Sequence, residues 1–160
     1  MTRLGMAQEM SVFDAARNNQ VEVLRQYVNK KYNIDTLNSK GHSLLILAVY
    51  NDNVEAAKYL IQQKANLSIQ DPSGNTALMG SCYKGYKEIT KILLANGADP
   101  SQLNYNSANA LFFAATFGHE EIVKQLLEYK IDKAQKDRLG KTARDYALIQ
   151  GNESIAELLK

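Results

Sequence analysis

The sequence repeats itself with a period of 33 residues. Residues 109–141 and 76–108 match when they are laid over each other: Gly118 falls on Gly85, Glu121 on Glu88, and Leu126-Leu127 on Leu93-Leu94. The same phase extends back through residues 43–75 and 10–42, and forward into 142–160, where the unit is cut short. A fixed period of this size is typical of a solenoid, in which stacked units bury a shared core. The sequence therefore predicts a stack of such units.

Several short motifs recur at fixed places in this period. They are the Thr-x-x-x-x-Ala type openings at 76–81 and 142–147, the run GHEEIVKQLL from Gly118 to Leu127, the loop Gly97-Ala98-Asp99, and the turns at 71–74 and 137–140. Together they resemble ankyrin repeats, although the Pro and His of that family's opening are absent and Ser107 stands where a turn glycine is expected. The resemblance implies an all-α repeat fold, an ankyrin-repeat solenoid of helix-turn-helix units with hairpin-like turns.

The period divides the chain into a leader and one domain. We expect a short leader at residues 1–9 and a single ankyrin-repeat domain at 10–160, with repeats 10–42, 43–75, 76–108, 109–141 and 142–160. In the last repeat Arg144 takes the phase that holds an aliphatic residue in the others: Val12, Leu45, Leu78 and Leu111. A charge is costly there unless no further repeat covers it. We therefore expect residues 142–160 to form a C-terminal cap that completes the chain.

Each first helix is bounded by residue types suited to helix ends. Its start is marked by a side chain that can accept a backbone N–H bond, namely Ser43, Thr76, Asn109 or Thr142. Its end is marked by a residue type that tolerates left-handed backbone, namely Asn19, Asp52, Gly85, Gly118 or Gly151.

Composition narrows the classes of function. The net charge of +2 supplies no overall field that would recruit nucleic acid or a membrane. The single cysteine, Cys82, has no partner for an internal disulfide, which suits a reducing compartment. No apolar run approaches the ~18 residues of a membrane span, and residues 1–10 lack the apolar core of a secretory signal. We therefore expect a cytoplasmic protein with no membrane partner.

The residues that usually carry enzyme chemistry are scarce. The two histidines, His42 and His119, lie beside a turn and at the start of a second helix, where the family resemblance implies a structural role for His119. Cys82 lies in the small-residue phase of a helix, which favours a buried, inert thiol. These residues do not provide a metal site of familiar spacing, a catalytic triad or a cofactor motif. We predict no enzyme activity, no cofactor and no metal.

A column of basic residues on the second helices is accompanied by a column of acidic residues. Arg25, Lys58, Lys91 and Lys124 each follow a glutamate by three residues: Glu22, Glu55, Glu88 and Glu121. Residues at this spacing are neighbours on a helix, so each glutamate is expected to pair with its own cation. A neutralised column disfavours nucleic-acid binding.

The ends of the first helices and the turn tips carry the candidate site. In ankyrin repeats these parts form the concave surface that grips partners, and here they hold Arg17, Tyr50, Asn51, Tyr83, Lys84, Tyr105, Phe117, Arg138 and Leu139. Tyr and Arg are enriched at interface hot spots. The alternative is that the aromatic rings pack on one another and only shield the joints between repeats.

These observations favour a non-catalytic module, expected to be monomeric, that binds another protein through its concave surface. Two alternatives remain. A dedicated inhibitor or immunity-type partner of one enzyme or toxin would form a tight complex. A binder of nucleic acid or a small ligand is less consistent with the balanced charges.

Overall fold

A computed structural model describes residues 12–160 as a series of helix pairs. Residues 12–17 are helical, and the later helices are α2 (Val21–Asn29), α3 (Leu44–Tyr50), α4 (Val54–Gln62), α5 (Ala77–Lys84), α6 (Lys87–Ala95), α7 (Ala110–Thr116), α8 (Glu120–Leu127), α9 (Ala143–Ile149) and α10 (Glu153–Leu158). This part of the chain contains an isolated β-bridge between Leu37 and Ser43 but no strand. The all-α repeat fold is confirmed, whereas the expected leader at 1–9 lies outside the described residues.

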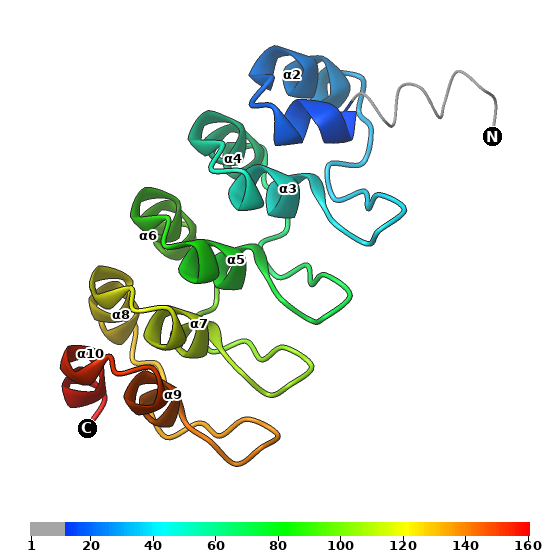
Figure 1. The fold of residues 1–160 in the computed structure, drawn as a ribbon. Coiled ribbons are helices and arrows are strands. Elements are labelled where there is room, and N and C mark those ends of the chain that lie inside the picture. The colour runs from blue at the N-terminus through cyan, green and yellow to red at the C-terminus, as the bar shows by residue number, and fades with distance from the viewer. Residues whose placement is uncertain (1–11) are drawn as a thin grey trace.

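The helices form two layers. In Figure 1 the inner layer holds α3, α5, α7 and α9, the outer layer holds α2, α4, α6, α8 and α10, and long loops extend from the inner layer on the side away from the outer one. Each helix from α2 to α10 contacts its counterpart in a neighbouring repeat, and the two helices contact each other within each of the four repeats between 43 and 160. None of these helices is long and apolar enough to cross a bilayer. The stack thus presents a surface between its inner helices and its loops.

The expected capping residues begin the inner helices. Oγ of Ser43 accepts a hydrogen bond from the backbone N–H of Ile46 at 3.2 Å, and the side chain of Asn109 accepts one from Leu111 at 3.1 Å. Thr142 and Asp145 cap reciprocally: Oγ1 of Thr142 accepts from the Asp145 N–H at 3.2 Å, while Oδ2 of Asp145 accepts from the Thr142 N–H at 2.8 Å. Such caps satisfy backbone N–H groups that have no partner inside the helix.

The residues expected to terminate the inner helices have left-handed backbone. Asn19 and Asp52 have φ of 56°, where Gly85 has 78° and Gly118 has 76°. The turn residue Ser107 also has a positive φ, of 61°, although it lacks glycine's conformational freedom. The period therefore fixes the backbone conformation even where the side chain departs from glycine.

Small side chains allow the inner helices to pack closely. Ala15, Ala48, Ala114 and Ala147 are fully buried in the same phase, and Ser81 occupies that phase in the third repeat. Leu148 belongs to the phase of buried Cys82 and Ala115, yet it is 47% exposed because no helix within residues 12–160 covers it. Arg144 is half-buried and donates from Nε to the carbonyl of Ala156 at 3.2 Å.

Buried polar groups in the third repeat have partners. Oγ1 of Thr90 donates to Oγ of Ser81 at 2.9 Å, and the Ser81 hydroxyl donates to the carbonyl of Leu78 at 2.8 Å. The neighbouring Cys82 thiol is fully buried, and this burial raises its pKa to about 12. The expectation of a buried, unreactive thiol is confirmed, because a thiol with such a pKa stays protonated at neutral pH.

Candidate partner-binding surface

The turn tips are shaped by an Asn or Asp that recurs every 33 residues. In each tip its Oδ1 accepts hydrogen bonds from the backbone N–H groups two and four residues later, and the four residues are Asn38, Asp71, Asn104 and Asp137. A side chain bonded in this way replaces a backbone turn contact and fixes the loop. This role was not predicted from the sequence, although the regular spacing of these residues was a signal for it.

Neighbouring tips are also tied to each other through their backbones. The N–H of Tyr105 donates to the carbonyl of Ser73 at 3.2 Å, and the N–H of Arg138 donates to the carbonyl of Asn106 at 3.0 Å. Tyr105 lies directly over Gly74, where an added Cβ would fall 2.6 Å from the Tyr105 ring. Tyr105 is still 55% exposed, and Leu139, at the tip of the last turn, is 77% exposed. Backbone hydrogen bonds therefore hold neighbouring turn tips together, and these tips carry exposed apolar side chains.

Tyr83 and Phe117 are brought together on the inner helices. Their ring centroids lie 4.7 Å apart at an interplanar angle of 90°, an edge-to-face arrangement. The rings do pack on each other, as the alternative interpretation expected, yet Tyr83 is 41% and Phe117 50% exposed. Nζ of Lys84 lies 5.9 Å from the Tyr83 ring centroid. Three of the residues named from sequence thus form one exposed cluster.

Tyr50 is less accessible than its neighbours on this surface. Its ring lies over Gly80 of the next inner helix, where an added Cβ would lie 3.0 Å from Cε2 of Tyr50. Burial, followed by the nearby Asp71 and Tyr83, raises the pKa of Tyr50 above its ordinary value. Asn51 is exposed and donates from Nδ2 to the carbonyl of Leu47 at 2.8 Å, ending α3. Tyr50 therefore seals the joint between two repeats and offers only part of its ring.

A groove of about 230 Å³ lies between α7, α9 and the turns that precede these two helices. Its walls are Asn104, Asn106, Ala108, Phe112, Phe113, Thr116, Phe117, Asp137 and Tyr146. Of the aromatic wall residues, only Phe117 was named from sequence as a binding residue. Phe113 and Tyr146 lie three residues before the phase that holds Tyr50 and Tyr83, which places them on the same helix face. This spacing was the signal that could have identified them.

A hydrogen bond to a carboxylate joins two residues of the groove wall. The Tyr146 hydroxyl donates to Oδ2 of Asp137 at 2.6 Å, and this bond, together with partial burial, raises the pKa of Tyr146 to about 12. Burial opposes ionisation of Asp137, but hydrogen bonds from Tyr146 and from the backbone of Lys141 and Leu139 outweigh it and lower the pKa of Asp137. Asp137 is therefore an ionised carboxylate whose oxygens already have donors.

Arg17 lies apart from this groove, in the first helical segment. Its Nη1 forms an ion pair with Oδ1 of Asp14 at 3.0 Å. Arg138 and Leu139 lie in the last turn, between α8 and α9. The residues named from sequence thus extend along the stack; Phe117 lies in the groove wall, and Tyr83 contacts it.

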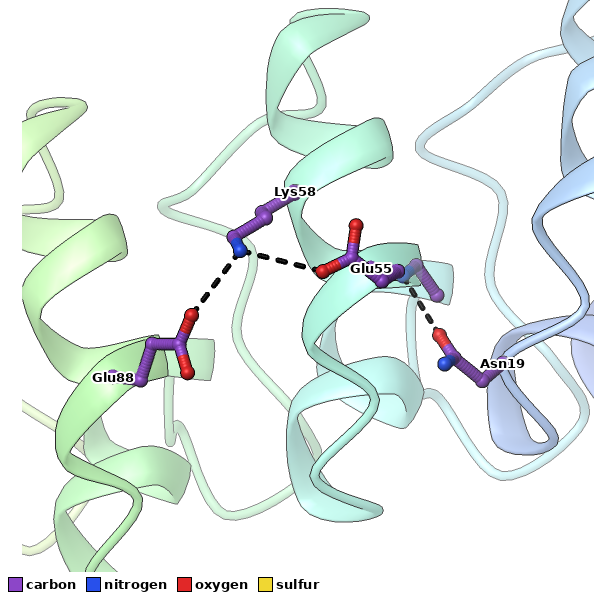
Figure 2. A network of polar contacts seen from close by, with 5 residues as sticks. Asn19, Glu55, Lys58 and Glu88 are labelled. Carbon is purple, nitrogen blue, oxygen red and sulfur yellow. Dashed lines mark hydrogen bonds and ion pairs between the residues drawn. The ribbon is translucent and has the colours of Figure 1, made fainter.

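The outer helices carry the ion pairs expected from their charge columns, with one difference. Nζ of Lys58 lies 3.3 Å from Oε1 of Glu55 and 3.1 Å from Oε1 of Glu88 in the next repeat, as Figure 2 shows. The expected pairing of Glu88 with Lys91 is wrong, because Glu88 turns toward Lys58, and Lys91 has no ion pair with any residue between 12 and 160. Lys124 pairs with Glu121 at 3.2 Å, as expected.

Two further residues expected to be structural make contacts between repeats. The side chain of Asn19, also drawn in Figure 2, accepts a hydrogen bond from the backbone N–H of Ala56 at 2.9 Å and thereby caps α4 from the preceding repeat. Nε2 of His119 lies 3.1 Å from the carbonyl oxygen of Tyr83. This contact agrees with the structural role that the family resemblance implied for His119. Over residues 12–160 no group of three or more His, Cys, Asp or Glu side chains is placed to hold a metal ion.

Comparisons with known proteins agree with this architecture. A family model described as ankyrin repeats, in three copies, matches residues 12–104 and again residues 101–160. No curated protein matches the chain in a sequence comparison. Ankyrin repeats are in general protein–protein interaction modules and are typically non-catalytic. With its stacked helix pairs and the match to nearly its whole length, the chain belongs to the ankyrin-repeat family.

Proposed function

We propose that this chain is a non-catalytic module that binds a protein partner through its concave surface, between the inner helices and the turn tips. The observation that carries the proposal is the exposed Tyr83–Phe117 pair at the margin of the groove lined by Phe113 and Tyr146. Large aromatic groups beside a concave site bury much area at low entropic cost, and such groups dominate binding energy at protein interfaces.

The alternatives have less support. The groove of about 230 Å³ is below the ~300–1,000 Å³ typical of small-molecule sites, so it better suits a side chain of a protein partner. Three of the four cations in the outer-helix column, Arg25, Lys58 and Lys124, pair with glutamates, so the column offers a phosphate backbone little unpaired charge. A dedicated inhibitor would use the same concave surface and differ in having one tight partner.

The proposal is tested by capture from a lysate of the source organism, with the bound proteins quantified by mass spectrometry. The full chain is compared with a Tyr83→Ala/Phe117→Ala variant. A matched control, Tyr129→Ala/Leu148→Ala, removes groups of similar exposure, 43% and 47%, outside the groove. Thermal melts first establish that all three proteins fold.

We expect a protein that is captured by the wild type and by the control but is lost with the Tyr83→Ala/Phe117→Ala variant. Capture of a single protein in equal molar amount would favour the alternative that the chain is a dedicated inhibitor of one enzyme or toxin. Capture that is the same for all three proteins would reject the concave surface as the site. Loss with the control alone would move the site to the C-terminal end of the stack.

We also propose that the chain acts as a cytoplasmic monomer. A single buried thiol and the lack of a disulfide suit a reducing compartment. Sedimentation over a range of concentrations tests the oligomeric state, where a mass near 17.9 kDa is expected throughout.

A further inference from the structure

The wall of the groove combines aromatic rings with one ionised carboxylate. Phe112, Phe113, Phe117 and Tyr146 supply the rings, and Asp137 supplies the carboxylate. The Tyr146 hydroxyl donates to Oδ2 of Asp137 at 2.6 Å, so the carboxylate is held beside a ring of the wall. Both kinds of group attract positive charge, the ring through its negative face and the carboxylate directly. The wall therefore favours a cation.

The Asp137 carboxylate can accept one further hydrogen bond. Its Oδ1 accepts from the backbone N–H groups of Leu139 and Lys141 at 2.9 and 3.0 Å, and its Oδ2 accepts from Tyr146. A carboxylate has about four lone-pair sites, so these donors leave one of them open on Oδ2. None of the ion pairs within residues 12–160 includes Asp137. Lys141, whose charge acts on Asp137, is exposed to solvent and forms no ion pair with it.

The side-chain donors of the wall are largely used within the protein. Three of them have internal acceptors: Nδ2 of Asn104 donates to Oδ1 of Asn75, Oγ1 of Thr116 to the carbonyl of Phe112, and the hydroxyl of Tyr146 to Asp137. The remaining side-chain donor of the wall is the amide of Asn106, which is equally an acceptor. An anion in the groove would thus meet a carboxylate and few free donors, whereas a cation brings donors of its own.

We propose that the partner inserts an arginine side chain into the groove, where its guanidinium group donates to Oδ2 of Asp137 and lies against the rings of Phe113 and Phe117. This inference rests on the proposed function and adds the chemistry of the partner. Phe113 and Phe117 are four residues apart, so they are neighbours on one face of the helix. Arginine suits such a site better than lysine, because its planar guanidinium group stacks on aromatic faces while it donates to a carboxylate.

The test separates the charge of Asp137 from its role in the turn. Asp137→Asn removes the charge but keeps the turn, because Asn38 and Asn104 make the same backbone hydrogen bonds in their own tips. Asp71→Asn is the matched control, since it makes the same substitution in a tip that does not line the groove. Each variant raises the net charge from +2 to +3, so the two differ only in where the charge is lost. Melting curves establish that both fold.

Phage-displayed random peptides are panned on the immobilised full chain, and we expect the enriched peptides to share an arginine. Each such peptide is then compared with a version in which citrulline, a neutral side chain of the same shape, replaces that arginine. The replacement should weaken binding to the wild type and to Asp71→Asn by a factor on the order of ten, because it removes a charge-assisted hydrogen bond. It should change binding to Asp137→Asn much less, since the carboxylate is already gone from that variant.

Three results would overturn the inference. Enriched peptides that lack arginine would reject it, and the proposed function would still stand if those peptides bind the Tyr83→Ala/Phe117→Ala variant more weakly. A citrulline replacement that weakens binding to the wild type and to Asp137→Asn equally would show that the arginine does not contact Asp137. If no peptide is enriched, a linear segment with an arginine is rejected, and the lysate capture decides the proposed function separately.

Discussion

Nε2 of His119 lies 3.1 Å from the carbonyl oxygen of Tyr83, across 36 residues of sequence and one boundary between repeats. The residues in the same phase of other repeats make equivalent bonds: Nδ2 of Asn53 donates to the carbonyl of Ala16 at 2.8 Å, and Nδ2 of Asn152 donates to that of Ala115 at 3.0 Å. The residue before each of these outer helices thus satisfies a carbonyl at the end of the preceding inner helix, where no intrahelical donor is available.

Replacement of His119 tests this bond. His119→Ala should lower the free energy of unfolding by about 1 kcal/mol, because it removes the hydrogen bond. His119→Asn should recover most of that loss, since asparagine makes the same bond at positions 53 and 152. Urea unfolding of the three proteins measures both effects. Equal losses for the two variants would show that ring packing over Gly85, rather than the hydrogen bond, is what His119 contributes.

Asn19 combines a left-handed backbone with a cap on the next repeat. Asn19→Gly permits the left-handed backbone conformation but removes the hydrogen bond to the Ala56 N–H. It should lower the free energy of unfolding by up to about 1 kcal/mol. Asn19→Ala should cost about 1–2 kcal/mol more, because alanine resists a φ of 56°. Thermal and urea unfolding check the order of the two variants. An alanine variant as stable as the glycine variant would contradict the assigned backbone conformation.

The bond between Tyr146 and Asp137 predicts a dependence of stability on pH. The folded state holds the Tyr146 proton until about pH 12, whereas an ordinary tyrosine loses it near 10.0, so raising the pH through this window favours unfolding. Tyr146→Phe should be less stable than wild type at neutral pH by about 1 kcal/mol. This gap should narrow as the pH rises from 10.0 toward 12.

In the acid range, the contribution of Asp137 to stability depends on pH in the opposite direction. Because the folded pKa of Asp137 lies below its ordinary 3.8, its contribution is complete above that pH and is lost as the pH falls through the folded value. Urea unfolding of wild type and Tyr146→Phe across both ranges gives the comparison. A gap that stays constant between pH 10.0 and 12 would contradict the bond.

The edge-to-face contact of Tyr83 with Phe117 can be measured by a double-mutant cycle. Each single alanine variant should lower stability modestly, since both rings are about half exposed. Their coupling should be about 0.5–1.5 kcal/mol, the range found for aromatic pairs in this arrangement. Chemical unfolding of the four proteins gives the value, and strictly additive effects would show that the rings act independently.

The buried pair Ser81 and Thr90 should be replaceable as a unit. In the next repeat the same phases hold Ala114 and Val123, both fully buried. Ser81→Ala/Thr90→Val removes both hydroxyls at once, so it leaves no unpaired polar group and should change stability by less than about 0.5 kcal/mol. Thr90→Val alone should cost more than the double variant. A double variant that loses the sum of the two single losses would contradict this account.

The sequence period predicts the parts of the fold that each repeat makes by itself. The caps at Ser43 and Thr142 and the positive φ at Asn19 and Ser107 depend on neighbouring residues, which lie in register along the chain. The burial of Leu111 follows equally from its phase. Such features depend on residues that are close together in the sequence, so they can be predicted from it directly.

Contacts between repeats are harder to predict from the sequence. Glu88 lies at the proper spacing from Lys91, yet it pairs with Lys58, because the lateral distance between outer helices brings that ammonium group as close as one on the same helix. The groove beside Phe113 and Tyr146 likewise depends on how far the tips stand from the inner helices. The sequence period does not contain those distances, so Phe117 was identified but the other aromatic residues of the groove wall were not.

The ring of Tyr50 fills space that Gly80, on the next inner helix, leaves vacant. The two positions are therefore complementary: Tyr50 has a large side chain and Gly80 has none. Each repeat supplies only one half of this contact. A chimaera that exchanged residues 43–75 for a repeat with a small residue at position 50 would open a hole above Gly80, and one that placed a side chain at position 80 would displace the ring. Along this surface, the complementary shape is therefore formed by two adjacent repeats together and not by one repeat alone.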